Sequence, residues 1–191
     1  MNRNSFLRRF LLSSAAPLEN MQPTLGNHRQ AAVLIALVER DNKLHVIFTE
    51  RALHLRHHPG QVSFPGGKHE QFDDNLQQTA IRETDEEIGI KAEQIEIIGQ
   101  LPPLATTSGF KVLPVIAFVD PHFELIIDAD EVQTVFEVPL NFLLNPKNVH
   151  LQHLTANKKR HFTYCIGYKN HLIWGATAQM LKNLQRLLYH Q

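Results

Sequence analysis

The chain has 191 residues, 43% of them hydrophobic and 20% charged, which excludes a wholly disordered chain and allows one domain with an ordinary core. Its 19 basic and 19 acidic residues cancel, and this balance is not typical of a protein that coats nucleic acid. The single cysteine, Cys165, excludes an internal disulfide or a cysteine-based zinc site and favours a reducing, cytoplasmic compartment. The longest apolar run, Ala31 to Val38, is far shorter than the roughly 20 residues that span a bilayer, so we expect no membrane segment.

Residues 1–28 are predicted to form a short helix and a lead-in loop. Three arginines before an apolar stretch imitate a signal peptide, but two serines interrupt that stretch, and an amphipathic helix is the favoured interpretation. The apolar face of this helix carries Phe6, Leu7, Phe10 and Leu11. The loop over 17–28 contains two prolines and a glycine. A single domain is expected over residues 29–191.

Strands outnumber helices in the remaining pattern, which predicts a mixed α/β domain. The expected strands cover 31–39 and 43–50, which form a hairpin, then 62–64, 93–99, 111–119, 132–138, 149–154 and 162–168. Pro114 places its strand at an edge or at a bulge. The expected helices cover 74–88, which Gly89 ends, a single turn over 140–144, and an amphipathic helix over 177–189.

The predicted helix over 74–88 carries a cluster of acids. Glu83, Glu86 and Glu87 fall within an arc of about 100° at 100° per residue, whereas Thr84 and Ile88 lie on the opposite, apolar side. Like charges at this spacing destabilise a helix, and a hard divalent cation would compensate them. A solvated acidic surface is the alternative explanation of the same run.

The residues before this helix favour the metal site. A turn without Cβ atoms at Gly66 and Gly67 lets the backbone approach a ligand closely. Gly67, an acid at Asp73 or Asp74, and the run from Arg82 to Ile90 together resemble the signature of the Nudix hydrolase family. Asp73 keeps the family's spacing from the glycine and Asp74 keeps its spacing to Arg82, so one residue is inserted.

This resemblance implies a Nudix-type α/β/α sandwich with a mixed sheet and a strand–loop–helix metal site. It implies an enzyme that hydrolyses a nucleoside diphosphate linked to another group, with Mg²⁺ or Mn²⁺ as cofactor. The implied metal ligands are Glu83, Glu86 and Glu87, with the backbone of Gly66 and the downstream acid Glu131 as further candidates. The resemblance also implies that Arg82 orients the glutamates through ion pairs and that one of the acids serves as the base.

A second stretch, from Phe48 to Gly67, resembles the motif that marks the coenzyme A diphosphatase branch of this family. The resemblance implies substrate-binding roles for Arg51, Arg56, Gly60, Phe64 and Gly67. Coenzyme A carries a 3′-phosphate besides its diphosphate, and guanidinium groups bind such anions in a bidentate manner. Three histidines of the same stretch, at 54, 57 and 58, are interpreted as a basic surface near the substrate or as plain surface residues rather than as metal ligands.

The expected activity is the metal-dependent hydrolysis of coenzyme A or its derivatives to 3′,5′-adenosine diphosphate and 4′-phosphopantetheine. Two alternatives stay open. The chain could be a Nudix hydrolase of another nucleotide diphosphate, such as NADH or ADP-ribose, or an inactive Nudix module that binds a nucleotide. The expected partner is a small molecule, with no nucleic acid and no membrane.

Overall fold

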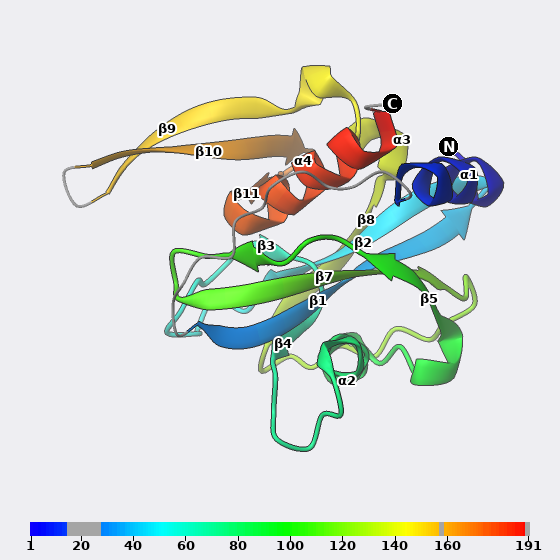
Figure 1. The fold of residues 1–191 in the computed structure, drawn as a ribbon. Helices are drawn as coiled ribbons and strands as arrows, with labels where there is room; N and C mark the ends of the chain where they lie inside the picture. Colours follow the sequence, from blue (N-terminus) through cyan, green and yellow to red (C-terminus); the bar gives the residue numbers. More distant parts are fainter. Residues whose placement is uncertain (15–27, 157–158, 190–191) are drawn as a thin grey trace.

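The computed structural model describes residues 1–14, 28–156 and 159–189, and Figure 1 shows the arrangement of its elements. The elements in chain order are α1 (Arg3–Ser14), β1 (Arg29–Arg40), β2 (Lys43–Arg51), β3 (Val62–Ser63), β4 (Gly66–Lys68), α2 (Leu76–Ile88), η1 (Ala92–Gln94), β5 (Ile95–Gln100), β6 (Leu104–Ala105), β7 (Phe110–Val119), β8 (Val132–Pro139), α3 (Leu140–Leu143), η2 (Pro146–Asn148), β9 (His150–Ala156), β10 (Lys159–Tyr168), β11 (His171–Trp174) and α4 (Gly175–Tyr189). The loop predicted over 17–28 lies outside the described residues, except for residue 28. None of the helices described is both long and apolar enough to cross a membrane.

Eight strands form one mixed sheet around β1. β1 pairs in parallel with β7 along one edge, from Arg29 opposite Phe110 to Val38 opposite Val119. The other edge of β1 is covered first by β4, which pairs with Ala31–Val33, and then by β2, whose pairing begins only at Leu37. β1 and β2 therefore diverge, and the glycine turn of β4 occupies the space between them.

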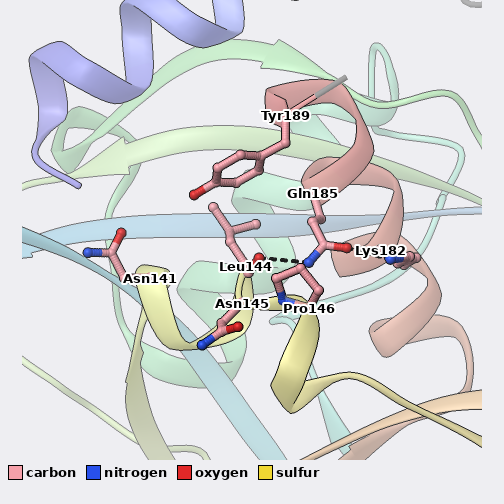
Figure 2. A pocket seen from close by; sticks show the side chains of 7 residues that line it. All are labelled: Asn141, Leu144, Asn145, Pro146, Lys182, Gln185 and Tyr189. Atoms are coloured by element: carbon pink, nitrogen blue, oxygen red, sulfur yellow. Dashed lines mark hydrogen bonds between the residues drawn. The ribbon is translucent and has the colours of Figure 1, made fainter. Parts of the chain in front are cut away.

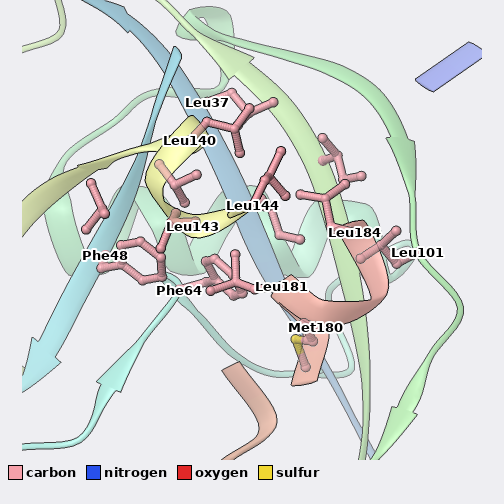
Figure 3. Close-up of a cluster of buried hydrophobic side chains, with 14 of the residues drawn as sticks. Leu37, Phe48, Phe64, Leu101, Leu140, Leu143, Leu144, Met180, Leu181 and Leu184 are labelled. Carbon is pink, nitrogen blue, oxygen red and sulfur yellow. The ribbon is translucent and has the colours of Figure 1, made fainter. Parts of the chain in front are cut away.

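The apolar run of β1 is buried on both faces of this sheet. Ile35 and Leu37 point into one hydrophobic cluster, whereas Leu34 and Ala36 point into the cluster on the opposite face. This alternation follows from the period of two residues in a strand. A strand covered on both faces has no polar side to present, which explains why β1 reads as a continuous apolar run. Figure 3 shows the first of the two clusters.

Helices cover both faces of the sheet. α2 lies on one face, where Ala80 and Ile88 join the second cluster, and it packs mainly against β1. α4 and α1 lie on the other face, and Phe6, Phe10 and Leu184 belong to the first cluster. Figure 1 shows these layers. The prediction of an α/β chain with a mixed sheet between helices is confirmed.

The first hairpin and the first helix match their predictions closely. Asp41 and Asn42 both have positive φ, at 48° and 58°, which is the geometry of a tight two-residue hairpin turn. On α1, Phe6 and Phe10 are buried and stack at a centroid distance of 5.9 Å. Leu11, expected on the same apolar face, is 60% exposed instead.

Pro114 does not mark an edge strand. β7 lies inside the sheet, between β1 and the strands β5 and β6. The recorded pairs of β5 end at Val115 and those of β6 resume at Val112, so Pro114 faces the break between these two strands. The proline therefore sits where the neighbouring strand is interrupted, and its missing N–H removes no bond from a continuous ladder.

The C-terminal strands form a second sheet that the sequence pattern did not separate. β9, β10 and β11 pair only with one another, in the order β11-β10-β9. β11 was not predicted, and α4 begins at Gly175 rather than at Thr177. This sheet lies beside α4 on the face opposite α2 (Figure 1).

Candidate functional site

The acidic helix α2 begins and ends where local sequence sets its termini. The side chain of Asn75 accepts hydrogen bonds from the backbone N–H groups of Gln77 and Gln78, which caps the first turn. Gly89 ends the helix with φ at 78°, in the left-handed conformation that glycine adopts without strain. The predicted helix is confirmed, with its first residue at Leu76.

The three glutamates of α2 have very different environments. Glu87 is buried, with 4% of the residue exposed, although it is an acid. The side chain of Glu83 is 14% exposed and that of Glu86 is 58% exposed. The acidic stripe is therefore not a uniformly solvated helix surface, because two of its three members are withdrawn from water.

The glycine turn of β4 lies directly against these two withdrawn acids. The N–H of Gly66 donates a hydrogen bond to Oε2 of Glu87 at 3.2 Å. A Cβ atom at Gly66 would lie 2.6 Å from the Cα of Val33, and one at Gly67 would lie 2.6 Å from Oε1 of Glu83. Such separations are too short for real atoms, so Gly66 lets the turn approach the backbone of β1, and Gly67 leaves room for the carboxylate of Glu83.

Arg82 connects the helix to the loop that precedes it. Its guanidinium donates to both carboxylate oxygens of Asp73, at 2.8 and 3.0 Å, and to the carbonyl oxygen of Lys68 at 3.0 Å. It also pairs with Glu83 at 3.0 Å and with Glu86 at 2.8 Å. The carboxylate of Asp73 is buried, and its bonds to Arg82 hold the pKa of Asp73 well below its usual range.

The inserted residue of the motif can now be placed. Asp73, and not Asp74, makes the contacts to Arg82, so the spacing from Gly67 is the one that the structure uses. The extra residue lies between Asp73 and the first turn of α2, where Asn75 caps the helix. The insertion therefore leaves the pairing of Arg82 with the loop intact.

A negative charge is unfavourable on both withdrawn acids. Burial raises the pKa of Glu87 to about 8 against the opposing hydrogen bond from Gly66, and the charges of Glu83 and Glu131 raise it further. Burial also raises the pKa of Glu83, with Arg82 opposing and with Glu86 and Glu131 contributing. A group that binds here with positive charge would relieve both acids.

Glu131 reaches this site from a different part of the chain. The loop between β7 and β8 runs along the C-terminal end of α2, where the N–H of Asp128 donates to the carbonyl of Glu87 at 3.0 Å. The carbonyl of Glu131 then accepts from the N–H of Ala52 at 2.9 Å, which joins the loop to the end of β2. The side chain of Glu131 is exposed, and its charge acts on both Glu83 and Glu87.

The oxygen-rich donor set fits a hard divalent cation. Mg²⁺ takes oxygen ligands and is usually held by one or two carboxylates, with water and substrate phosphates completing its shell. Within the described part of the chain, no three His, Cys, Asp or Glu side chains lie close enough to enclose a metal ion by themselves. One buried and one partly buried carboxylate beside a backbone turn match the partial shell that Mg²⁺ requires, and Mn²⁺ accepts the same ligands.

Three of the predicted substrate residues, Arg51, Arg56 and Gly60, lie at the end of β2 and in the loop that follows it. Arg51 ends β2 and pairs with Val132 of β8, next to Glu131, and its charge lowers the pKa of Glu87. Arg56 lies in the exposed loop after β2. Gly60 closes this loop, with φ at 68° and its N–H donating to the carbonyl of Arg51 at 3.0 Å.

The structure corrects the predicted substrate-binding role of Phe64. Its side chain is 1% exposed and stacks on Phe48 at a centroid distance of 5.1 Å, inside the first hydrophobic cluster. A ring that is buried among core side chains cannot contact substrate. Phe64 therefore anchors the start of the glycine turn to the core, and Gly67 likewise serves by leaving room for Glu83.

A pocket between α3 and α4 lies away from these acids. It has a volume of about 480 Å³, and its lining residues are Asn141, Leu144, Asn145, Pro146, Lys182, Gln185 and Tyr189. Figure 2 shows it between α3 and α4, with Gln185 donating to the carbonyl of Leu144. These elements cover the face of the sheet opposite α2, and the lining contains no carboxylate, so the cavity does not belong to the acidic site.

Sequence comparison identifies the class to which this fold and site belong. The model of the NUDIX domain matches residues 28–158, which include β1, the glycine turn, all of α2 and Glu131. The chain therefore belongs to the Nudix family, whose members hydrolyse nucleotide diphosphates.

Individual relatives agree with this assignment. The chain is 38% identical to an uncharacterized Nudix hydrolase NudL of Enterobacter sp. over 181 residues, which cover 95% of this chain and 92% of the relative. It is 39% identical to NudL of Salmonella newport over the same length. A MutT/nudix family protein from Enterococcus faecalis shares the fold with a TM-score of 0.52 and 15% identity, over 98% of this chain and 74% of that one.

Two features of the site were not predictable from the motif. The burial of Glu87 depends on the glycine turn and on the loop before β8, which lie far apart in sequence. Thr79 was also missed, although its hydroxyl donates to Oδ2 of Asp73 at 2.8 Å and helps to hold that acid against Arg82. A threonine near the start of a predicted helix gives no signal that separates this role from ordinary packing.

Proposed function

We propose that the chain hydrolyses the diphosphate bond of coenzyme A or its derivatives, giving 3′,5′-adenosine diphosphate and 4′-phosphopantetheine, in the cytoplasm. The observation that carries the proposal is a pair of acids, the buried Glu87 and the partly buried Glu83, against the Gly66–Gly67 turn with the positive charge of Arg51 nearby. An anionic substrate and a cation would complete this arrangement of charges.

The proposed metal ligands are Glu83, Glu86 and Glu87, together with the backbone of Gly66 and the carboxylate of Glu131. Among the described residues no three acids lie close enough to enclose one ion, so Glu86 and Glu131 would have to turn their side chains toward the ion that Glu83 and Glu87 hold. Bound Mg²⁺ or Mn²⁺ supplies a positive charge that polarises the phosphoryl oxygens and lowers the pKa of water. Arg82 keeps Glu83 and Glu86 oriented, since it is itself fixed by the buried Asp73. A carboxylate of this set would accept the proton of the attacking water.

The two arginines are assigned to different parts of the substrate. Arg51 acts electrostatically on Glu87, which places its charge close to the proposed metal and suits the diphosphate. Arg56 is exposed on the loop closed by Gly60, and it makes no hydrogen bond or ion pair with the other described residues. A guanidinium that is free on this loop suits the 3′-phosphate of coenzyme A.

The test is a hydrolysis assay with coenzyme A, NADH and ADP-ribose, each with Mg²⁺ and with a chelator, followed by identification of the products. We expect Mg²⁺-dependent release of 3′,5′-adenosine diphosphate, with coenzyme A as the best of the three substrates. Faster turnover of NADH or ADP-ribose would refute coenzyme A as the substrate but would still support hydrolysis of a nucleotide diphosphate. Binding of a nucleotide without any turnover would favour an inactive module instead.

A further inference from the structure

Phe72 is the most exposed large apolar side chain among the described residues. It lies directly before the buried Asp73, and 70% of the residue is exposed. The guanidinium carbon of Arg82 lies 5.2 Å from the centroid of its ring. The same guanidinium reaches Glu83 at 3.0 Å and Glu86 at 2.8 Å, so the ring is separated from the proposed metal ligands by one side chain.

Arg82 does not depend on this ring for its position. Both oxygens of the buried Asp73 and the carbonyl of Lys68 already accept hydrogen bonds from the guanidinium. A bidentate carboxylate fixes the plane of a guanidinium more firmly than a ring contact does, because its two bonds are directional and charge-assisted. A phenyl ring that served only to shield Arg82 would bury its surface there, whereas most of Phe72 faces solvent.

We propose that Phe72 is a platform on which the base of the substrate nucleotide stacks. The ring is one guanidinium away from Glu83, because its centroid lies 5.2 Å from the guanidinium carbon of Arg82 and Arg82 contacts Glu83 at 3.0 Å. The ribose of a nucleotide separates its base from its diphosphate in the same way, so a base could reach this ring. Aromatic side chains stack on bases in this way whichever base is present. The inference rests on a nucleotide diphosphate as the substrate, but not on coenzyme A in particular.

The experiment measures binding by calorimetry, with Mg²⁺ present, for ADP and for inorganic pyrophosphate, which lacks a base. We expect Phe72→Ala to weaken ADP binding by about tenfold, within the range of about 5- to 150-fold that stacking of one base provides, and to leave pyrophosphate binding unchanged. Phe72→Trp should keep the affinity for ADP, and ADP should quench the fluorescence of the new indole. The ring is exposed, so these variants are expected to fold.

The matched control is Phe162→Ala, because Phe162 is 63% exposed but lies on β10 of the second sheet. It should bind both ligands as the parent chain does. The proposal is overturned if Phe72→Ala weakens ADP and pyrophosphate equally, which would make the ring a brace for Arg82, or if it weakens neither. It is also overturned if the parent chain binds ADP no more tightly than pyrophosphate. If the parent chain does not hydrolyse coenzyme A but Phe72→Ala selectively loses ADP binding, the proposed substrate is refuted and this inference stands.

Discussion

Replacing Glu87 by Gln should stabilise the metal-free protein while abolishing its metal-dependent activity. Glu87 is 4% exposed, and burial raises its pKa to about 8 from an ordinary value of 4.5. Glutamine has nearly the same shape and can still accept the hydrogen bond from the N–H of Gly66, but it carries no charge. The two effects have opposite signs, so no general damage to the fold could produce both.

The expected gain in stability follows from proton linkage. An acid whose pKa is raised by folding contributes stability that is fully present below its unfolded pKa and is lost as the pH rises through the folded pKa. For Glu87 this interval runs from about 4.5 to about 8. At pH 7 about 2.5 pH units of it have been crossed, which corresponds to about 3 kcal/mol at 1.36 kcal/mol per unit. Glu87→Gln escapes this loss, and its Tm should exceed that of the parent by roughly 6–12 °C for a chain of this size.

The assay is thermal unfolding with a chelator at pH 4.5, 7 and 8.5, followed by the same series with Mg²⁺. The gain at pH 7 relative to pH 4.5 isolates the charge, because any consequence of the new amide is the same at both values. Mg²⁺ should raise the Tm of the parent by mass action and leave Glu87→Gln nearly unchanged. A gain that does not depend on pH, or no gain at all, would refute the electrostatic reasoning. Glu86→Gln is the control, since its exposed pair with Arg82 should change stability by less than about 1 kcal/mol.

Three further substitutions test other parts of the site. Asp73→Asn removes the buried partner of Arg82 and should destabilise the fold by about 3–5 kcal/mol, measured by urea unfolding at pH 7, where Asp73→Glu should recover part of the loss. Gly67→Ala should lower kcat at saturating Mg²⁺ by at least tenfold, because the new Cβ would displace the carboxylate of Glu83, whereas Gly167→Ala meets no neighbour within 4 Å and should be silent. Arg56→Ala should raise the KM for coenzyme A by about 10- to 150-fold and that for dephospho-coenzyme A by less than about twofold, since only the former carries the 3′-phosphate.

The local features of the site were predictable from the sequence because they depend on short-range chemistry. The helix over α2 follows from its period, from the cap at Asn75 and from the stop at Gly89. The close approach of the chain at Gly66 and Gly67 follows from the absence of a Cβ atom. The choice between Asp73 and Asp74 did not follow, because both spacings occur in the chain and only the contact with Arg82 separates them.

Long-range packing explains what the sequence pattern missed. Phe64 belongs to a motif, which suggested a contact with substrate, but its burial against Phe48 of β2 is a tertiary effect. Pro114 suggested an edge or a bulge, but the break between β5 and β6 opposite it cannot be predicted from the sequence of β7 itself. In the same way, the exposure of Leu11 depends on which side of α1 faces the sheet, and apolar spacing defines that side only to within one position.

Two buried carboxylates of this site show what the chain supplies and what it leaves to a ligand. The hydrogen bonds from Arg82 hold the pKa of Asp73 well below its usual range, because the counter-charge of Asp73 is part of the fold. Glu87 is buried to a similar degree, yet its pKa is raised, because its direct partner is the neutral N–H of Gly66 and the nearest acids repel it. Desolvation is therefore compensated at one acid and left uncompensated at the other. The uncompensated acid lies beside the glycine turn and the loop of Glu131, where a cation can reach it. The site thus keeps its uncompensated acid at the position where we propose that the divalent metal of a Nudix hydrolase binds.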